Sequence, residues 1–528
     1  MSNTESTDPT LESRGGGGGK KRLWLAAGVV VTIVAVIGGI ALATTGDGTA
    51  SASGTGSAPS ANPNASVTVG LVLEPTNLDI RATAGAALDQ VLIDNVYEGL
   101  LTRTAAGKLV PSLASAWKVS SDALTYTFTL KDGVTFSNGD PLTSQNVVWS
   151  IKNLIDKKLV ESASLGSVKD VSAPNKATVQ IRLASPYPDL LWALSGRAGL
   201  VLDAAATNDL KTSAIGSGPY LLDTWKQGDS ITLKRNNGYW GKDKAKVAEV
   251  VVRYITDPNA AVNAVLSGDL DVLAPVTATL RPQVDKLKGV RVVEGDAPDK
   301  FVLAFNNAKA PFTDIRVRQA VRYAIDHKAL VTARGGVDQV LGGPITSSDP
   351  GYEDLSALYP HDPTKAKTLL ADAGFSGGLA LKLTIPSFYG AEIPDLLTSQ
   401  LAEVGIILTV KRVEFSTWLS DVFTKKNYDL SIVDHAENHD FGAWANPDYY
   451  FGYANKDVHN LYAQSQTAST ADGSDALLRK AARIVSQDAA ADWLFNYRTL
   501  TVVSNRVHGF PTDAVNSRLD LTGLSAAS

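Results

Sequence analysis

The chain has 528 residues, 44% of them hydrophobic, with a formal net charge of −5 at pH 7 and no cysteine. The lack of cysteine excludes disulfides, thiolate metal ligands, cysteine nucleophiles and a lipid-modified cysteine. The lysines and arginines are dispersed without a long basic stripe, which argues against a nucleic-acid partner, and the length predicts at least two lobes.

The amino-terminal part of the sequence predicts a membrane attachment. Residues 23–43 form an uncharged apolar run of 21 residues, and about 20 residues suffice to cross a bilayer as a helix. The basic residues Lys20–Arg22 precede this run, so the positive-inside rule keeps 1–22 as a cytoplasmic tail and places the main domain outside the cytoplasm. Residues 44–66 then form a flexible linker. We predict a single-pass anchor in the cell membrane; the alternative is a signal sequence cleaved near 41–43, which would release a secreted protein.

A strand, two turns and a helix follow in the first half of the main domain. In Leu124–Leu130 large apolar side chains alternate with threonines, the period-2 pattern of a strand with one buried face. The Asp-Gly and Asn-Gly pairs at 132–133 and 138–139 supply the positive-φ positions of tight turns. Thr143 or Ser144 can then cap a helix that carries an apolar face.

The second half predicts helices alternating with strands, which is typical of an α/β lobe. One helix is expected over Thr313–Ala333, and another begins at the Asp362-Pro363 pair and ends at Gly374. The further elements predicted are strand 379–385, helix 393–404, strand 406–413, helix 416–424 and strand 428–433.

Several blocks recur in a fixed order along the chain. They are VYEGLL (96–101), PSLASAW (111–117), the stretch 124–151, GSGPYLL (216–222), NNGYWG (236–241) and FNNAKAPFTDIRVRQAVRYAID (305–326). In order and spacing this set resembles the extracytoplasmic solute-binding proteins of ABC importers, family 5, the peptide, dipeptide and nickel class. The resemblance covers nearly the whole chain after residue 66.

The resemblance implies an α/β, two-lobed periplasmic-binding-protein-like fold of type II, in the large peptide-binding class, with a hinge between the lobes. Lobe I is expected over 67–300, completed by 504–528, and lobe II over 301–503. Two strands would cross between the lobes at 300–305 and 493–503. The implied function is that of a monomeric substrate-binding component of an ABC transporter, which captures short peptides in the hinged cleft and delivers them to the permease complex in the membrane.

Residues 434–453 form the densest polar and aromatic cluster of the sequence and directly follow a predicted strand. Because ligands of α/β folds bind at the carboxyl ends of strands, we predict that this segment is a cleft loop. The resemblance implies an acidic residue here that pairs with the α-amino group of a peptide, and the candidates are Asp440 and Glu437. A solvated loop charge remains the alternative for either carboxylate.

Aromatic side chains near this segment are candidates for side-chain pockets, since they bury large areas and keep a polar handle. Some of them are expected to belong to the core instead. The predicted ligand-binding set contains Trp444, Tyr449, Tyr450 and His435 from the loop, and Phe388 and Tyr389 from the end of another strand.

His435 and His439 also suggest a metal site, because two histidines at i and i+4 of a helix can bind one ion. The sequence H-A-E-N-H is not the H-E-x-x-H motif, however, and Gly442 and Pro447 favour a loop over a helix. We predict no bound metal and keep this pair as an alternative. A loop whose histidines titrate near neutral pH is a further interpretation.

No catalytic motif stands out in the sequence, so we predict that the protein is not an enzyme and needs no cofactor. Two other functions remain open at this point. One is a nickel or metal-chelate binding protein, which the histidines favour. The other is a sensory ectodomain, which would need a separate signalling partner because the tail before Leu23 is short.

Overall fold

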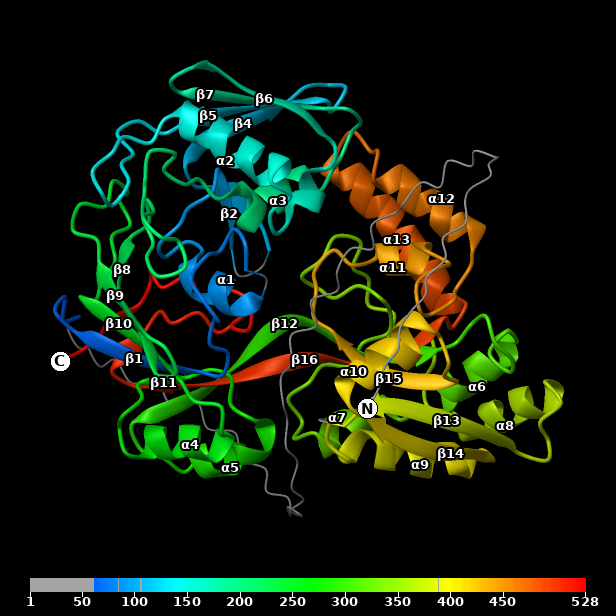
Figure 1. Ribbon diagram of the computed structural model, residues 1–528. Coiled ribbons are helices and arrows are strands. Elements are labelled where there is room, and N and C mark those ends of the chain that lie inside the picture. Colours follow the sequence, from blue (N-terminus) through cyan, green and yellow to red (C-terminus); the bar gives the residue numbers. More distant parts are fainter. Residues whose placement is uncertain (1–60, 84, 105–106, 388) are drawn as a thin grey trace, which may run out of the picture. The chain divides into compact units, whose positions relative to one another are not determined.

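The computed structural model describes residues 61–83, 85–104, 107–387 and 389–528 (Figure 1). The predicted tail and anchor, most of the linker and the candidate Phe388 lie outside the described residues. Within the described ranges, every helix is too short or too polar to cross a membrane.

Strands and helices alternate along the chain. The first part contains β1 (Ser66–Leu71), α1 (Ala86–Leu92), β2 (Leu101–Arg103), β3 (Leu109–Pro111), β4 (Ala114–Val119), β5 (Thr125–Leu130), α2 (Ser144–Asp156), β6 (Val168–Asn175), β7 (Thr178–Leu183), α3 (Leu190–Leu194), β8 (Tyr220–Lys226), β9 (Ser230–Arg235), β10 (Glu249–Tyr254), α4 (Pro258–Leu266), β11 (Val272–Leu273) and α5 (Arg281–Val284).

The second part contains β12 (Val290–Phe305), α6 (Ile315–Ala324), α7 (His327–Ala333), α8 (Pro363–Asp372), β13 (Leu379–Pro386), α9 (Glu392–Glu403), β14 (Ile406–Val413), α10 (Phe415–Trp418), a π-helix (Leu419–Thr424), β15 (Leu430–His435), α11 (Gly442–Ala445), α12 (Lys456–Ser465), α13 (Ala471–Gln487), β16 (Ala491–Ser504), β17 (Val507–His508) and β18 (Ser525–Ala526).

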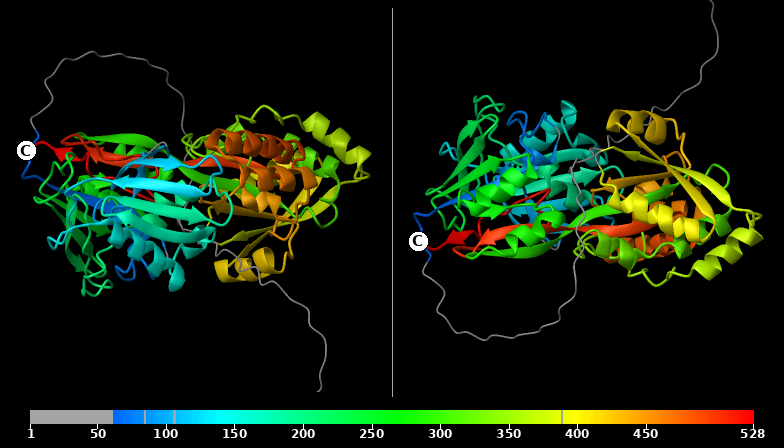
Figure 2. Two further views of the ribbon diagram at one scale, coloured as in Figure 1. Left: turned by 90° about the horizontal axis from the view of Figure 1, so that it is seen from above. Right: turned by 90° about the horizontal axis from the view of Figure 1, so that it is seen from below.

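Ten strands form one mixed sheet in the order β14-β13-β15-β12-β16-β11-β1-β10-β9-β8. β1 runs parallel to β10 and β11, β13 runs parallel to β14 and β15, and the long strands β12 and β16 pair antiparallel between these groups. Figure 2 shows β12 and β16 side by side in both views. A separate sheet has the order β4-β5-β7-β6.

The strand predicted over 124–130 is confirmed as β5. Its apolar side chains Tyr126, Phe128 and Leu130 are buried, while the threonines between them are partly or fully exposed. The helix predicted after it is α2. It begins with a capping box in which Thr143 and Asn146 satisfy each other's free N–H groups, and it packs its apolar face into the same core.

The second half confirms most of the predicted elements and corrects three of them. The single helix predicted over 313–333 is two helices, because Ile325 is extended and the Asp326 side chain caps α7 through the N–H of Ala329. The helix predicted over 416–424 divides into the short α10 and a π-helix. The last predicted strand, β15, begins and ends two residues later than expected, and Tyr428 before it is buried in the core.

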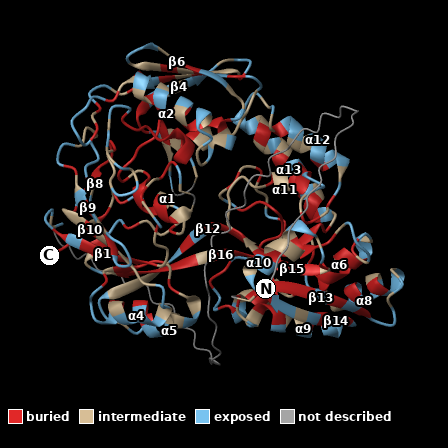
Figure 3. Cartoon of the chain, viewed as in Figure 1, coloured by how far each residue is buried: buried red, intermediate tan, exposed pale blue. Residues whose placement is uncertain are grey.

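β12 and β16 each contribute side chains to more than one hydrophobic core. In β16, Val503 packs with Val69 and other residues of the first part of the chain, whereas Phe495 packs with Leu383 and other residues of the second part. Most residues of both strands are buried (Figure 3). Crossing strands near 300–305 and 493–503 were expected from the sequence, and the lobe boundaries stay predictions.

An irregularity interrupts the pairing of β12 with β16. Asp296 pairs with Arg498 and Lys300 pairs with Asn496, so three residues of β12 face one residue of β16. The Asn496 amide nitrogen donates hydrogen bonds of 2.8 Å each to the carbonyl oxygens of Ala297 and Asp299. One buried side chain thus replaces the missing backbone partners at this bulge.

Glu98 predicts a pH dependence of stability. Burial raises the pKa of Glu98 from 4.5 to about 7, although hydrogen bonds from Ser217, Tyr239 and Trp240 favour its charged form. The folded state therefore binds the proton more tightly than the unfolded state. Stability is expected to fall by about 3 kcal/mol as the pH rises from about 4.5 to about 7.

Other buried acids add to this trend, so the measurement is a difference between variants. In chemical denaturation at pH 5 and pH 7, Glu98→Gln is expected to show a smaller decrease in unfolding free energy than the wild-type chain. An equal decrease in both proteins would contradict the assignment to Glu98.

The two ends of the described main domain lie together. Ala61 forms an isolated β-bridge with Ala527, and the Asn62 N–H donates to the Ala526 carbonyl oxygen at 2.8 Å. In Figure 1 the blue β1 strand and the label C accordingly lie next to each other.

Candidate functional site

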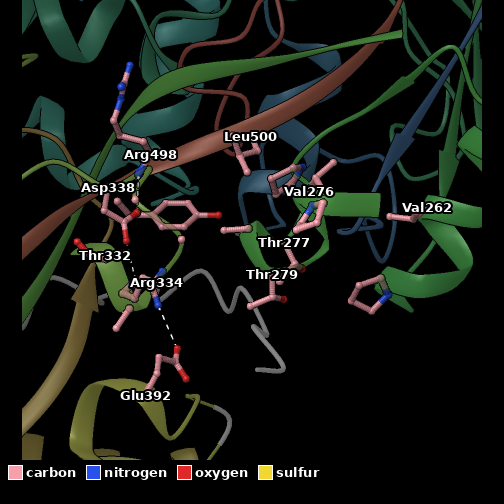
Figure 4. A pocket seen from close by; sticks show the side chains of 18 of the residues that line it. Val262, Val276, Thr277, Thr279, Thr332, Arg334, Asp338, Glu392, Arg498 and Leu500 are labelled. Carbon is pink, nitrogen blue, oxygen red and sulfur yellow. Dashed lines mark hydrogen bonds and ion pairs between the residues drawn. The ribbon is translucent and has the colours of Figure 1, made fainter. Parts of the chain in front are cut away.

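A cavity of about 1100 Å³ is lined by residues that lie far apart in the sequence (Figure 4). Its walls come from the segment after β1, from α4 and its preceding residues, from the segment after β11, from the end of α7, from the start of α9 and from β16. Ligand pockets commonly have volumes of about 300–1,000 Å³, so this cavity is large enough for an extended small molecule.

One wall of the cavity is apolar and carries hydroxyl groups. Val262, Val276 and Leu500 supply apolar surface, and Thr277 and Thr279 add side-chain hydroxyls. Within the part of the chain that the structure describes, these two hydroxyls take part in no intramolecular hydrogen bond. They can therefore donate to or accept from a bound molecule.

The other wall is charged. The Arg334 Nε atom lies 2.6 Å from Asp338 Oδ2, and its Nη1 atom lies 3.3 Å from Glu392 Oε1. Gly335 and Gly336 both have positive φ values, 101° and 76°, which only glycine adopts readily. The chain therefore turns back after α7, and Arg334 and Asp338 face each other. Burial raises the pKa of Asp338 even though the guanidinium opposes this effect.

Tyr497 joins this cavity to the predicted cleft loop. It lines the cavity, and its pKa is raised by burial and by the nearby charges of Asp299 and Asp434. Asp299 and Asp434 share a hydrogen bond between their carboxyl groups, and burial raises the pKa of Asp299 to about 6. The Asp434 N–H donates to the Tyr389 hydroxyl at 2.9 Å.

Asp440 is paired with a lysine of the protein itself. The Lys300 Nζ atom lies 3.2 Å from Asp440 Oδ1 and donates to the carbonyl oxygens of Glu437, at 2.8 Å, and Pro298, at 3.3 Å. The Lys300 side chain is only 2% exposed. Burial alone would lower the pKa of this ammonium, but the carboxylates around it, Asp440 foremost, hold the pKa above its ordinary value.

Glu437 and His435 complete this buried cluster. Burial raises the pKa of Glu437 to about 7, and its Oε1 atom has no hydrogen-bond partner in the described part of the chain. Burial lowers the pKa of His435 to about 3, so the imidazole is neutral, and its Nε2 atom lies 3.0 Å from the Tyr450 hydroxyl. Ligand atoms of His435, Glu437 and Asp440 lie within 4.8 Å of one another.

His439 is directed toward a different part of the chain. Its ring stacks on Trp192 of α3 with 4.0 Å between the centroids, and its Nδ1 atom lies 3.0 Å from Asp189 Oδ1. His435 and His439 therefore do not converge on one point. The contact also ties the loop after β15 to the segment around α3.

The predicted aromatic residues are mostly packed in cores. Trp444 stacks on Phe451 at 4.0 Å and Tyr450 is fully buried beside it, whereas Tyr449 is only partly buried. Tyr389 packs edge-on against Phe301 in another core. These positions leave the predicted ligand-binding roles untested, and they stay predictions.

Sequence reasoning missed the residues of the cavity, including Arg334, Asp338 and Glu392. They come from the end of one helix, the turn after it and the start of another helix, about 60 residues further along the chain. The only local signal is the Gly335-Gly336 pair, which predicts a turn and no charge cluster.

Comparisons with known proteins agree with this architecture. The family model described as bacterial extracellular solute-binding proteins, family 5 Middle, matches residues 108–459. The Escherichia coli K12 protein named "Probable D,D-dipeptide-binding periplasmic protein DdpA" is 26% identical over 437 residues, covering 75% of this chain and 81% of its own length. The glutathione-binding protein GsiB of the same strain is 25% identical over 452 residues, covering 81% of this chain and 88% of its own length.

The fold is also similar to that of a solved structure. The crystal structure of the ABC transporter substrate binding protein CtaP from Listeria monocytogenes matches with a TM-score of 0.79 and 22% identity, covering 88% of this chain and all of that one. The predicted α/β, two-lobed fold class is thereby confirmed.

Proposed function

The chain belongs to family 5 of the bacterial extracellular solute-binding proteins, and from this premise we propose that it captures short peptides outside the cytoplasm and delivers them to an ABC permease. Family membership confirms the prediction of a binding protein rather than an enzyme. The predicted anchor over residues 23–43 would hold the receptor at the cell membrane.

The observation that carries this proposal is the large cavity with one apolar and one charged wall. A peptide offers apolar side chains together with charged ends and backbone groups, so it can use both walls at once. The names of two relatives support this choice of cargo, because one is described as binding D,D-dipeptides and the other glutathione, itself a tripeptide.

Ligand contacts to both walls would favour one arrangement of the chain. The wall with Val276 and Thr277 and the wall with Arg334 belong to segments that are connected through β12 and β16. A ligand that contacts both walls binds more tightly to the arrangement in which the walls are close. Only this difference in affinity between the open and closed arrangements can drive a hinge closure. The permease would then recognise the closed, loaded receptor.

We place the amino end of the peptide toward the carboxyl end of β15 and the loop after it, because Asp434, near the end of this strand, lies beside the cavity residue Tyr497. Asp440 already has Lys300 as its cationic partner. Glu437 is the better amine anchor of the two predicted carboxylates, since its Oε1 atom has no partner among the described residues.

Glu437→Gln is expected to weaken binding of a peptide with a free amino group by about tenfold or more, because a charge-assisted hydrogen bond is lost. Binding of the N-acetylated form of the same peptide should change much less. Isothermal titration calorimetry with both forms measures the two losses, and equal losses would contradict the amine-anchor role.

Identification of the natural cargo tests the proposed function itself. The full-length chain is purified under native conditions, denatured, and examined for released molecules by mass spectrometry, with metal analysis of the same sample. A series of short peptides without stoichiometric metal would support the proposal. Recovery of a single non-peptide compound would contradict it.

Uptake of a metal ion or metal chelate is the second candidate function. It is favoured by the close approach of His435, Glu437 and Asp440 and by the neutral His435 ring, which can bind a metal. The Lys300 ammonium in the same cluster opposes a cation there. Stoichiometric nickel or another metal in the purified protein, without peptides, would favour this candidate. A sensory ectodomain remains the alternative if no permease is found to interact with the chain.

A further inference from the structure

The charges that line the large cavity do not balance. Among the described lining residues, two are cationic, Arg334 and Arg498, and three are acidic, Asp338, Glu392 and Asp395. How much charge each residue presents to a ligand in the cavity depends on the ion pairs that it already forms.

Arg498 offsets carboxylates that lie outside the cavity lining. Its Nε atom lies 2.9 Å from Asp296 Oδ1, and its Nη1 atom lies 3.3 Å from Glu294 Oε2. Figure 4 shows its side chain directed away from the other labelled groups. The guanidinium therefore pairs with carboxylates outside the lining. The Arg498 backbone N–H donates to Asp338 Oδ1 at 3.2 Å, and Arg334 is the cation that forms ion pairs with acids of the described lining.

Arg334 is mainly the partner of Asp338. Its contact with Asp338 is 2.6 Å long and both side chains are buried, whereas the contact with Glu392 is 3.3 Å long. The Arg334 guanidinium is also held over the Phe495 ring, at 4.6 Å from its centroid. Arg334 thus forms ion pairs with both carboxylates, and the buried Asp338 is its closer partner.

Glu392 and Asp395 are left as a pair of acids on the first turn of α9. The Glu392 carboxylate lies against Gly390, at a place that any side chain on residue 390 would fill. Asp395 is exposed and forms no ion pair within the described ranges. The amino end of a helix favours negative charge nearby, which suits two carboxylates at this position.

From this imbalance we propose that the cavity selects ligands that carry a positive charge on an apolar body, and that Glu392 and Asp395 recognise that charge. The inference rests on the proposed function and names a class of peptide, those with a lysine or arginine side chain. The apolar wall with Val262 and Val276 would hold the aliphatic part of such a side chain. An anionic side chain would be repelled by the Asp395 carboxylate, which forms no ion pair within the described ranges, and by Glu392 beside it.

Three tripeptides that differ only in the central side chain test the inference: Ala-Lys-Ala, Ala-norleucine-Ala and Ala-Glu-Ala. Norleucine matches the lysine chain without its charge. In calorimetric titrations of the full-length chain, the lysine peptide is expected to bind about tenfold or more tightly than the norleucine peptide, and the glutamate peptide most weakly.

Variants of α9 test the residues. Glu392→Gln and Asp395→Asn are each expected to reduce the affinity ratio of the lysine and norleucine peptides by at least threefold. Asp395→Asn breaks no ion pair of the described chain, so it stays informative if Glu392→Gln folds poorly. Glu403→Gln, at the exposed far end of the same helix, is the matched control and should keep the wild-type ratio.

The outcomes distinguish a failure of the proposed peptide function from a failure of the proposed charge selectivity. If none of the three peptides binds, the proposed function fails. If all three bind with equal affinity, the peptide function stands and the charge selectivity is overturned. If the lysine preference persists unchanged in the Glu392→Gln, Asp395→Asn double variant, the assignment to these two acids is overturned.

Discussion

Replacing Lys300 by methionine is expected to lower the free energy of unfolding by about 3–5 kcal/mol, the usual cost of removing one partner of a buried ion pair. Methionine keeps most of the length of the side chain and removes its charge. The partly buried Asp440 would then lose its cation, and the Glu437 and Pro298 carbonyl oxygens would lose their donor. Urea denaturation of both proteins at pH 7 measures the loss.

Lys309→Met is the matched control for this prediction. Lys309 also pairs with an aspartate, Asp429, at 2.8 Å, but its side chain is 51% exposed. Exposed ion pairs typically contribute about 0–1 kcal/mol, so this variant should be nearly as stable as the wild-type chain. If both variants lost the same small amount, the Lys300 ammonium would not have the structural role that its burial indicates.

Asn496→Ala is expected to destabilise the fold by roughly 2–6 kcal/mol, because each of two buried polar groups left without a partner costs about 1–3 kcal/mol. The two groups affected are the carbonyl oxygens of Ala297 and Asp299 at the bulge of β12. Since β12 and β16 connect the proposed ligand walls, the same change should also weaken ligand binding. Thermal unfolding and calorimetric titration measure the two effects.

Asn505→Ala serves as the control, because Asn505 is an exposed asparagine just beyond the end of β16. A surface change of this kind normally shifts the unfolding free energy by less than about 0.5 kcal/mol. A stable Asn496→Ala variant would mean that water or a backbone shift satisfies the two carbonyl oxygens.

The sequence predicted most of the fold because the signals for its elements are local. Alternation of apolar residues over 124–130 and over 406–413 defined β5 and β14 closely, and the Asp-Pro pair at 362–363 marked the start of α8. The helix expected over 313–333 was wrong as a single element, because the apolar periodicity continues across Ile325 while the Asp326 cap starts a new helix.

The candidate site was harder to predict because it depends on contacts between distant segments. Lys300 and Asp440 are 140 positions apart, and nothing in the sequence around Asp440 indicates that a lysine of β12 will reach it. The aromatic residues around Tyr450 suggested a ligand surface, since a pocket and a core need the same side chains. Their burial became clear only once Trp418 and Trp493 were placed beside them.

The bridge between Ala61 and Ala527 has a consequence for how the domain can be engineered. A short linker can join residue 528 to residue 61 without crossing the protein, so the main domain is compatible with circular permutation. The exposed connection between α8 and β13, at Ser376 and Gly377, offers a place for the new ends. A reporter attached there would sit on the charged-wall side of the chain, whereas one attached at residue 528 would stay beside β1.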